Sequence, residues 1–249
     1  MSNAIPLHVA LCTKLYYRCF PLYRAIYFAY KKISDRALIK SLKSHISARD
    51  LQGGIILDLG ANIGFYSRFF AENAPAATIY AVEPEPRNVA RLRAEAGGFS
   101  QVKIFPAAVA DRAGELEFTL SANSVIDHHL GCGAGETAGE KIKVPAVTID
   151  EICAGLPRVE IIKMDIQGAE GLALRGARQT LARSSGAVIV MELFPWGFTR
   201  MGDSWEKFID LCRELRLEIS APDGIDVVAF CRENANNPAA YANIELRVG

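Results

Sequence analysis

The stretch at residues 55–64 (IILDLGANIG) constrains the fold of this chain more strongly than any other segment. An apolar run reaches Asp58, a tight turn with Gly60 and Asn62 follows, and a helical pattern begins at Gly64. A glycine turn between a buried strand and a helix N-terminus allows the backbone to approach a bound cofactor closely. The stretch therefore predicts a strand–turn–helix unit that binds a cofactor.

A second carboxylate follows the next expected strand. Residues 78–83 end at Glu83, where a carboxylate usually holds the ribose hydroxyls of a nucleoside cofactor. The turn differs from the dinucleotide fingerprint G-x-G-x-x-G, because Asp58 precedes the first glycine in the pattern D-x-G-x-N-x-G. A carboxylate there repels pyrophosphate but suits the positive charges of S-adenosylmethionine. These features favour S-adenosylmethionine over NAD as the cofactor.

From residue 55 onward, strand and helix patterns alternate, which predicts an α/β fold with a mostly parallel sheet. The expected strands are 55–59, 78–83, 101–107, 115–120, 141–144, 159–165, 187–193, 217–220 and 225–231. The expected helices are 63–73, 86–96, 149–154, 169–183 and 204–215. We predict an N-terminal helical extension or lid at 1–48, a catalytic domain at 49–232, and a C-terminal tail at 233–249 that lies on the surface.

The charge balance argues against a general nucleic-acid-binding surface, because 28 Lys and Arg residues face 28 Asp and Glu residues. The six cysteines form no C-x-x-C pair and match neither zinc spacing nor a dense disulfide framework. We interpret them as reduced thiols, which predicts a cytoplasmic protein. The oligomeric state stays open.

The first fifty residues are strongly basic, with nine Lys or Arg against two acids. Charged residues interrupt the apolar run at 7–30, which excludes a membrane-spanning helix there. Apolar side chains at i+4 spacing predict two amphipathic helices separated at Pro21: Leu7, Leu11 and Leu15, then Leu22, Ile26 and Tyr30. One interpretation is peripheral membrane contact, and the other is a lid packed on the catalytic domain. We favour the lid, because aromatic-rich stripes usually pack in a core.

Ligands of open parallel sheets bind beyond the carboxyl ends of the strands. Several carboxylates converging there are costly unless cations or hydroxyl groups bind among them. The residues expected at this edge are Asp58, Glu83, Ala108, Asp165 and Glu192.

Several ordered motifs resemble the FkbM type of S-adenosylmethionine-dependent methyltransferase. The resemblance covers about residues 50–195 and includes 58–64, 81–88, 107–114, 144–150, 163–170 (KMDIQGAE) and 174–177 (LRGA). One departure is Gln167, where many members of the family have Glu, and this removes a candidate metal ligand.

The resemblance implies a Rossmann-like class I methyltransferase sheet, with its last strand antiparallel and helices on both faces. It also implies methyl transfer to a hydroxyl of a sugar, glycan or secondary metabolite, so the expected partner is a small-molecule or glycan acceptor. By the same analogy Asp58, Gly60 and Asn62 line the methionine end of S-adenosylmethionine, and Gly64 opens the helix beside it. Glu83 takes the ribose, and the strand end at 107–109, with Ala108, flanks adenine.

A hydroxyl is a poor nucleophile until a base takes its proton. Asp165 is our first candidate for contact with the acceptor, and it borders the cofactor as well. His128 and His129 come second, because histidine titrates near neutral pH and both lie in the irregular segment 121–140. Lys163 reaches the acceptor or supports Asp165. Glu192 ends an apolar strand, where burial raises its pKa and suits it to proton transfer.

Three alternatives remain at this stage. Asp165 and Glu192 together offer oxygen ligands for Mg²⁺, although we predict no metal. A NAD(P)-dependent oxidoreductase would need the glycine spacing that this turn lacks. A non-catalytic S-adenosylmethionine-binding scaffold would keep the cofactor residues but transfer no methyl group.

Overall fold

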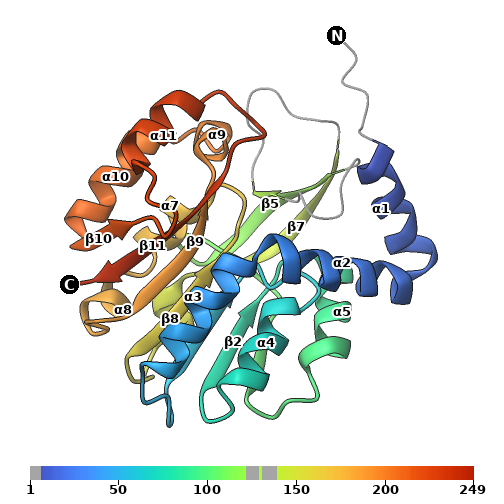
Figure 1. Ribbon diagram of the computed structural model, residues 1–249, viewed down its shortest axis with the longest axis horizontal. Coiled ribbons are helices and arrows are strands. Elements are labelled where there is room, and N and C mark those ends of the chain that lie inside the picture. Colours follow the sequence, from blue (N-terminus) through green and yellow to red (C-terminus); the bar gives the residue numbers. More distant parts are fainter. Residues whose placement is uncertain (1–6, 122–128, 131–138) are drawn as a thin grey trace.

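The computed structural model describes residues 7–121, 129–130 and 139–249, and the side chains of 11–120 and 140–249. Seven strands form the main sheet in the order β10-β11-β9-β8-β1-β2-β3 (Figure 1). Its strands are β1 (Ile55–Leu59), β2 (Thr78–Val82), β3 (Val102–Phe105), β8 (Val159–Met164), β9 (Val188–Leu193), β10 (Leu217–Ser220) and β11 (Ala242–Val248). β11 runs antiparallel to β9 and β10, whereas the other neighbouring strands are parallel. The predicted fold class is confirmed.

Both faces of this sheet are buried, so its central strands are mostly apolar. Along β1, Ile55, Leu57 and Leu59 pack into one core, and Ile56 packs into a second core on the opposite face. Helices cover both faces: α4 (Phe65–Asn73), α5 (Pro86–Ala96), α6 (Ile149–Ile152), α7 (Glu170–Arg175), α8 (Arg178–Ala182), α9 (Pro195–Arg200), α10 (Trp205–Glu214) and α11 (Val227–Asn234). A sheet covered in this way binds ligands at its edge rather than on a face.

A smaller sheet follows β3, in the order β4-β7-β5-β6. It comprises β4 (Ala108–Val109), β5 (Gly114–Ser121), β6 (His129–Leu130) and β7 (Gly139–Val147). The long pair β5–β7 extends away from the main sheet (Figure 1). Phe118 and Val144 of this sheet pack with Ala108 and Ala169 in a small separate core. The second sheet therefore reaches the β8–α7 connection.

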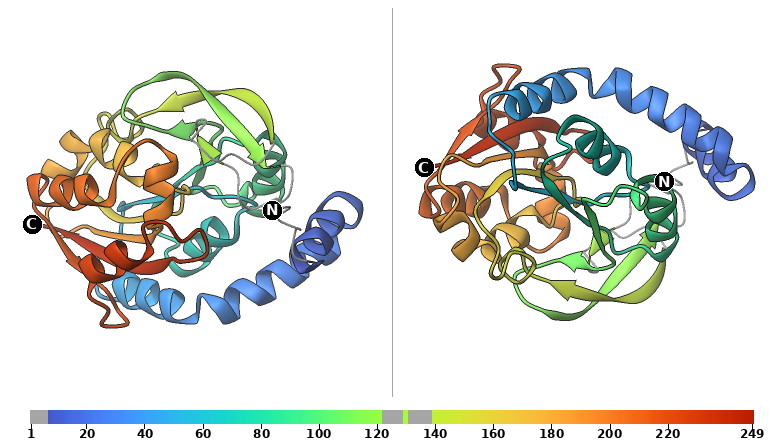
Figure 2. Two further views of the ribbon diagram at one scale, coloured as in Figure 1. Left: turned by 90° about the horizontal axis from the view of Figure 1, so that it is seen from above. Right: turned by 90° about the horizontal axis from the view of Figure 1, so that it is seen from below.

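Three helices precede the sheet: α1 (Leu7–Arg18), α2 (Phe20–Ser34) and α3 (Arg36–Ser47). Figure 2 shows them as an arc along one side of the domain. Pro21 lies in the first turn of α2, where a missing N–H costs no helical hydrogen bond, so α2 starts there as predicted. In the part of the chain that the structure describes, no helix is both long and apolar enough to cross a membrane.

The face of these helices that packs on the domain differs from the predicted stripe. Tyr16 and Tyr23 are buried against Ile63, whereas Leu22 and Ile26 are 49% and 46% exposed. Of the predicted i+4 stripe, Leu15 packs against this core, but the expectation is wrong for Leu22 and Ile26, because the aromatic side chains beside them make the contact.

The C-terminal prediction is also wrong. Residues 225–231, expected as a strand, lie mostly in α11, because the Asp226 side chain caps the helix by accepting a hydrogen bond from the Ala229 N–H at 3.0 Å. The expected surface tail 233–249 contains β11, which lies between β9 and β10. Its residues Ile244, Leu246 and Val248 are buried in the core.

The predicted helix 169–183 is two short helices, α7 and α8. A Cβ at Gly176 would lie 2.4 Å from the Ala110 carbonyl oxygen, so the chain passes too close to the β4 end for a side chain. The helix breaks where this close approach occurs. A further helix, α9, follows β9 where none was expected.

Candidate active site

The glycine turn after β1 joins the ends of three strands. The N–H groups of Gly60 and Ala61 both donate to the Val82 carbonyl oxygen at 3.0 Å. Gly60 has a φ of +78°, and a Cβ there would lie 1.9 Å from the Asp165 carbonyl oxygen. The turn therefore holds the ends of β1, β2 and β8 against one another.

Asp58 lies beneath this turn and is fully buried. The Ser67 hydroxyl of α4 donates to its Oδ2 at 2.6 Å, while its Oδ1 is buried without a hydrogen-bond partner in the described structure. Burial raises the pKa of Asp58, against the opposing effects of Lys163 and Ser67. A buried carboxylate oxygen without a donor is a costly feature that a bound ammonium or N–H group would relieve.

Glu83 accepts two backbone hydrogen bonds, one from the glycine turn and one from the start of the segment that leads into α5. The Asn62 N–H donates to Oε2 at 2.8 Å, and the Glu85 N–H donates to Oε1 at 3.0 Å. Burial raises the pKa of Glu83 to about 7 against the opposing hydrogen bonds of Glu85, Asn62 and the Asn88 side chain. A carboxylate has about four lone-pair positions, so Glu83 keeps acceptor capacity for a ligand hydroxyl.

Asn62 itself has a left-handed backbone, with φ of 50°. Its Oδ1 accepts a hydrogen bond from the Ile63 N–H at 2.7 Å, which stabilises this conformation locally. Gly64 follows with φ of +95° and is the N-cap of α4. A side chain on Gly64 would approach Leu92 of α5 to 3.0 Å, so the turn also sets how closely α4 and α5 pack.

Asp165 follows β8 at the same edge of the sheet. Lys163 Nζ lies 3.1 Å from its Oδ2, and Gln167 Nε2 donates to its Oδ1 at 3.1 Å. Burial alone would raise the pKa of Asp165, but the positive charges of Lys163 and Lys31 outweigh burial and lower it. Asp165 is therefore an anion that contacts Lys163 and is further stabilised by the charge of Lys31.

Glu192, near the end of β9, has the opposite electrostatic environment. Burial and the negative charge of Asp165 raise its pKa to about 8. The mutual influence of Glu192, Asp165 and Lys163 shows that the structure brings these three predicted residues into one electrostatic cluster.

The N-terminal helices contribute groups that the sequence analysis did not assign to the site. Lys31 of α2 pairs with Asp35 and lies 5.4 Å from the ring centre of Tyr66. Lys163 lies 4.8 Å from the same ring, and the Tyr66 hydroxyl donates to Asp35 Oδ2 at 2.5 Å. Tyr66 thus contacts both cations that lower the pKa of Asp165.

A second contact joins the N-terminal helices to the Glu83 region. The Tyr16 hydroxyl of α1 donates to the Asn88 Oδ1 of α5 at 2.8 Å in a buried position. The Glu85 side chain accepts from the Asn88 N–H at 2.5 Å and caps α5. Motif reasoning missed these residues because it considered strand ends alone. The excess of basic residues in the first fifty was the available signal for Lys31.

The remaining predicted site residues are Ala108, His128 and His129. Ala108 is buried in the small core with Phe118 and Val144. His129 is on β6, whose backbone pairs with β5, but its side chain lies outside the described residues, as does all of His128. The structure therefore leaves both histidines as predictions.

No group of three or more His, Cys, Asp or Glu side chains within the described ranges is arranged to hold a metal ion. A hollow of about 250 Å³ lies beside Gly168, and the other residues that line it are Leu172, Arg175, Met201, Gly202, Asp203 and Lys207. None of the predicted site residues lines it.

The sheet order, its single antiparallel strand and the site at the carboxyl ends of β1, β2 and β8 define the class I methyltransferase architecture. The fold is similar to that of a putative rRNA methylase from Clostridium thermocellum, with a TM-score of 0.51 at 8% identity, over 84% of this chain and 94% of that chain. This likeness shows the fold alone.

The chain belongs to the FkbM methyltransferase family, because the profile of the "Methyltransferase FkbM domain" matches residues 58–219. It is 31% identical over 162 residues to the 2-O-methyltransferase NoeI of Sinorhizobium fredii, which covers 58% of this chain and 67% of that protein. It is 27% identical over 154 residues to the 31-O-demethyl-FK506 methyltransferase FkbM of Streptomyces tacrolimicus, over 50% and 59%. The predicted family and methyltransferase activity are confirmed, and these comparisons give the oxidoreductase alternative no support.

Proposed function

We propose that this protein transfers a methyl group from S-adenosylmethionine to a hydroxyl oxygen of a small-molecule or glycan acceptor. The observation that carries the proposal is the pairing, at one edge of the sheet, of the Gly60 turn and Glu83 with the cluster of Asp165, Lys163 and Glu192. The names of the two relatives, a 2-O-methyltransferase and a 31-O-demethyl-FK506 methyltransferase, support oxygen as the atom methylated.

The residues of the glycine turn fit the proposed cofactor. Asp58 has a buried Oδ1 to which no described residue donates, and this suits the ammonium of the methionine end. Glu83 has acceptor capacity left for a ribose hydroxyl. Gly60, Asn62 and Gly64 would hold the backbone close to the cofactor, and Ala108 would lie near adenine. When bound, S-adenosylmethionine supplies an electrophilic methyl group on a sulfonium.

We assign proton removal to Glu192 and positioning to Asp165. A base works best when its pKa lies near the working pH, and the pKa of Glu192 is about 8. Asp165 has a lowered pKa, so it is a weak base but a permanent hydrogen-bond acceptor. It would orient the acceptor hydroxyl, while Lys163 and Lys31 hold the carboxylate in place. Because Lys163 already pairs with Asp165, the Mg²⁺ alternative receives no support.

Calorimetric titration with S-adenosylhomocysteine tests the cofactor site. We expect wild-type protein to bind this product and not NAD⁺ or NADP⁺. Glu83→Ala removes a hydrogen-bond acceptor from the ribose and should weaken binding by about tenfold to a hundredfold. The control Glu72→Ala, at an exposed carboxylate of α4, should bind normally. Binding of a dinucleotide, or equal loss in the control, would contradict the proposal.

The pH dependence of kcat/KM tests the assignment of the base. Because Glu192 must be deprotonated to accept a proton, activity should rise with pH through about 8. Glu192→Gln should lower kcat by at least about a hundredfold and remove this rise, with cofactor affinity unchanged. An unchanged pH profile in the variant would assign the base elsewhere, with His128 and His129 as the next candidates.

The scaffold alternative makes a different prediction. Binding of S-adenosylhomocysteine without methylation of any hydroxyl in a broad panel of sugars, glycans and secondary metabolites would support the scaffold alternative.

The free, buried thiols Cys153, Cys212 and Cys231 are consistent with a cytoplasmic location, which we retain as part of the proposal.

A further inference from the structure

The inner face of α1 and α2 accounts for their packing on the domain. Tyr16 and Tyr23 are buried, and they form a small core with Ile63. Phe28 packs edge to face on Phe65 of α4, with ring centres 5.1 Å apart. These contacts attach the helices without using the side chains on the opposite side.

The outer face of the same helices is also apolar. Among the described side chains, seven large hydrophobic ones are exposed, and six of them lie on α1 and α2: Leu11, Tyr17, Leu22, Ile26, Tyr30 and Ile33. Ile33 is 77% exposed. Leu22, Ile26, Tyr30 and Ile33 follow helical spacing along α2 and so share one face. Single exposed apolar residues are ordinary, but this concentration on one face is not.

Two of the seven are set aside, because Tyr17 accepts a hydrogen bond from Arg87 of α5 and Tyr241 lies before β11, outside these helices. We call Leu11, Leu22, Ile26, Tyr30 and Ile33 the outer apolar face.

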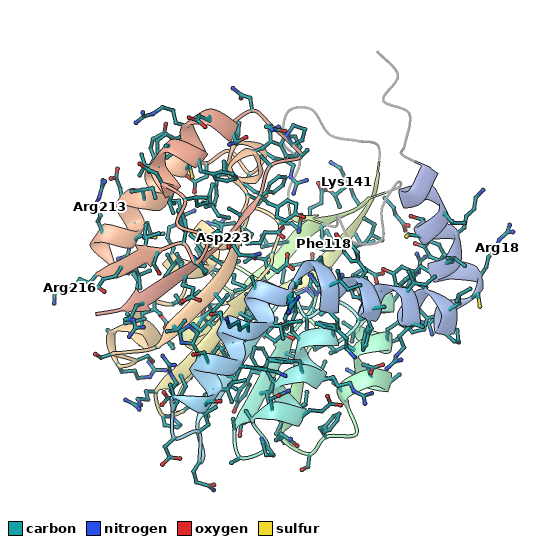
Figure 3. The ribbon with its side chains drawn as sticks, in the orientation of Figure 1. Arg18, Phe118, Lys141, Arg213, Arg216 and Asp223 are labelled. Carbon is teal, nitrogen blue, oxygen red and sulfur yellow. The ribbon has the colours of Figure 1, made fainter. Side chains whose placement is uncertain are left out.

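Exposed cations lie on α1, α2 and the adjoining α3. Six exposed basic residues of α1–α3 have no ion pair within the described structure: Lys14, Arg18, Lys32, Arg36, Lys40 and Lys43. Lys32, Arg36, Lys40 and Lys43 recur at intervals of about one helical turn, and Arg18 points away from the molecule (Figure 3). The one acid within these three helices and their connections, Asp35, is already bound by Lys31 and Tyr66. The region therefore presents a net positive surface.

We propose that α1–α3 dock on the surface of an anionic lipid bilayer, with the outer apolar face inserted and the six cations against the headgroups. An apolar stripe flanked by Lys and Arg is the arrangement of helices that lie in a membrane interface. Each Lys or Arg near an anionic surface contributes attraction that depends on salt. A second copy of the chain fits this face less well, because it would bring two sets of six cations together.

Docking and the site use opposite sides of one helix. Lys31 of α2 acts on Asp165, while Lys32 and Ile33 belong to the outer surface. The docking proposal does not rest on the methyltransferase chemistry, so it is testable without cofactor or acceptor.

Vesicle sedimentation with the full chain tests the proposal. We expect binding to vesicles of phosphatidylcholine and phosphatidylglycerol, weaker binding at high salt, and no binding to pure phosphatidylcholine. Ile33→Asp replaces an inserted apolar side chain by a charge, so it should reduce partitioning by more than about tenfold. Ile26→Asp is a second variant on the same face, and circular dichroism checks that both variants fold.

A pair of matched charge reversals separates local attraction from net charge. Lys14→Glu/Lys32→Glu should abolish binding. Arg213→Glu/Arg216→Glu changes the net charge equally at the opposite edge of the molecule from α1 (Figure 3) and should retain binding. Equal loss in both double variants would overturn the proposal. A lack of vesicle binding by wild-type protein would also overturn the proposal. If light scattering then showed a dimer that Ile33→Asp dissociates, the face would be an interface between two copies of the chain.

Discussion

At the residue scale, Gly60 has no room for any side chain. Its φ of +78° is unfavourable for other residues, and the Asp165 carbonyl oxygen occupies the position of a Cβ. Gly186 has the same φ of +78°, but no atom lies within 4 Å of the position that a Cβ would take there. The two glycines therefore share the same φ, but only at Gly60 would a Cβ clash with a neighbouring atom.

Gly60→Ala should destabilise the protein far more than Gly186→Ala. The control carries the left-handed backbone cost of about 1–2 kcal/mol. Gly60→Ala adds overpacking against the backbone of Asp165, for a total of at least about 3 kcal/mol. Urea unfolding of both variants measures the difference. Equal losses would mean that the close approach of the β1 and β8 ends contributes nothing to stability.

The sequence predicts those site residues that belong to short motifs and misses those that meet only through the packing of distant helices. Gly60 and Glu83 belong to short motifs whose strand, turn and helix are adjacent in the chain, so their meeting follows from the order of a parallel sheet. Lys31 and Tyr66 meet through the packing of α2 on α4, which no local pattern encodes. Local motifs therefore predicted the glycine turn and Lys163, but they missed Lys31, the second cation that lowers the pKa of Asp165.

At the element scale, β11 is the strand that the sequence analysis misassigned. Ile244, Leu246 and Val248 alternate with more exposed residues, a period of two that is visible in the sequence. The amide-rich segment before it favoured a surface tail. The β-branched run at 225–231 offered a competing strand, which the cap at Asp226 turned into a helix.

Ile244→Ala should therefore cost about 2–5 kcal/mol in the free energy of unfolding, because its side chain is fully buried between two strands of the sheet. Arg247→Ala, on the same strand but exposed, should change stability by less than about 0.5 kcal/mol. Chemical denaturation of the two variants provides the measurement. A loss below about 1 kcal/mol for Ile244→Ala would contradict the placement of β11 in the core.

At the scale of the whole molecule, a net charge of zero conceals an uneven distribution. Six exposed cations without an ion pair in the described structure lie on α1–α3, whereas buried carboxylates lie at the carboxyl edge of the sheet. Burial raises the pKa of Glu83 and Glu170 to about 7 and that of Glu192 to about 8. The folded protein therefore holds protons near neutral pH that the unfolded chain has already released.

Stability should consequently fall as the pH rises toward 8. A carboxyl group whose pKa is raised on folding stabilises the protein fully below its unfolded pKa, and this contribution is lost as the pH passes through the folded value. Glu170 is the cleanest example, because its Oε1 accepts from the N–H groups of Ile166 and Gly168 while its buried Oε2 has no donor in the described structure. A neutral side chain of the same shape would keep those two bonds.

Glu170→Gln should therefore match wild type near about pH 4 and exceed its unfolding free energy by up to about 3 kcal/mol near about pH 8. The gain follows from the shift of the Glu170 pKa from 4.5 to about 7, which the amide cannot undergo. Urea denaturation across this range measures it, with Glu72→Gln at an exposed carboxylate as the control. If the difference between Glu170→Gln and wild type did not change with pH, Glu170 would not be the group that binds the proton, and the fall in stability would have to arise from Asp58, Glu83 and Glu192.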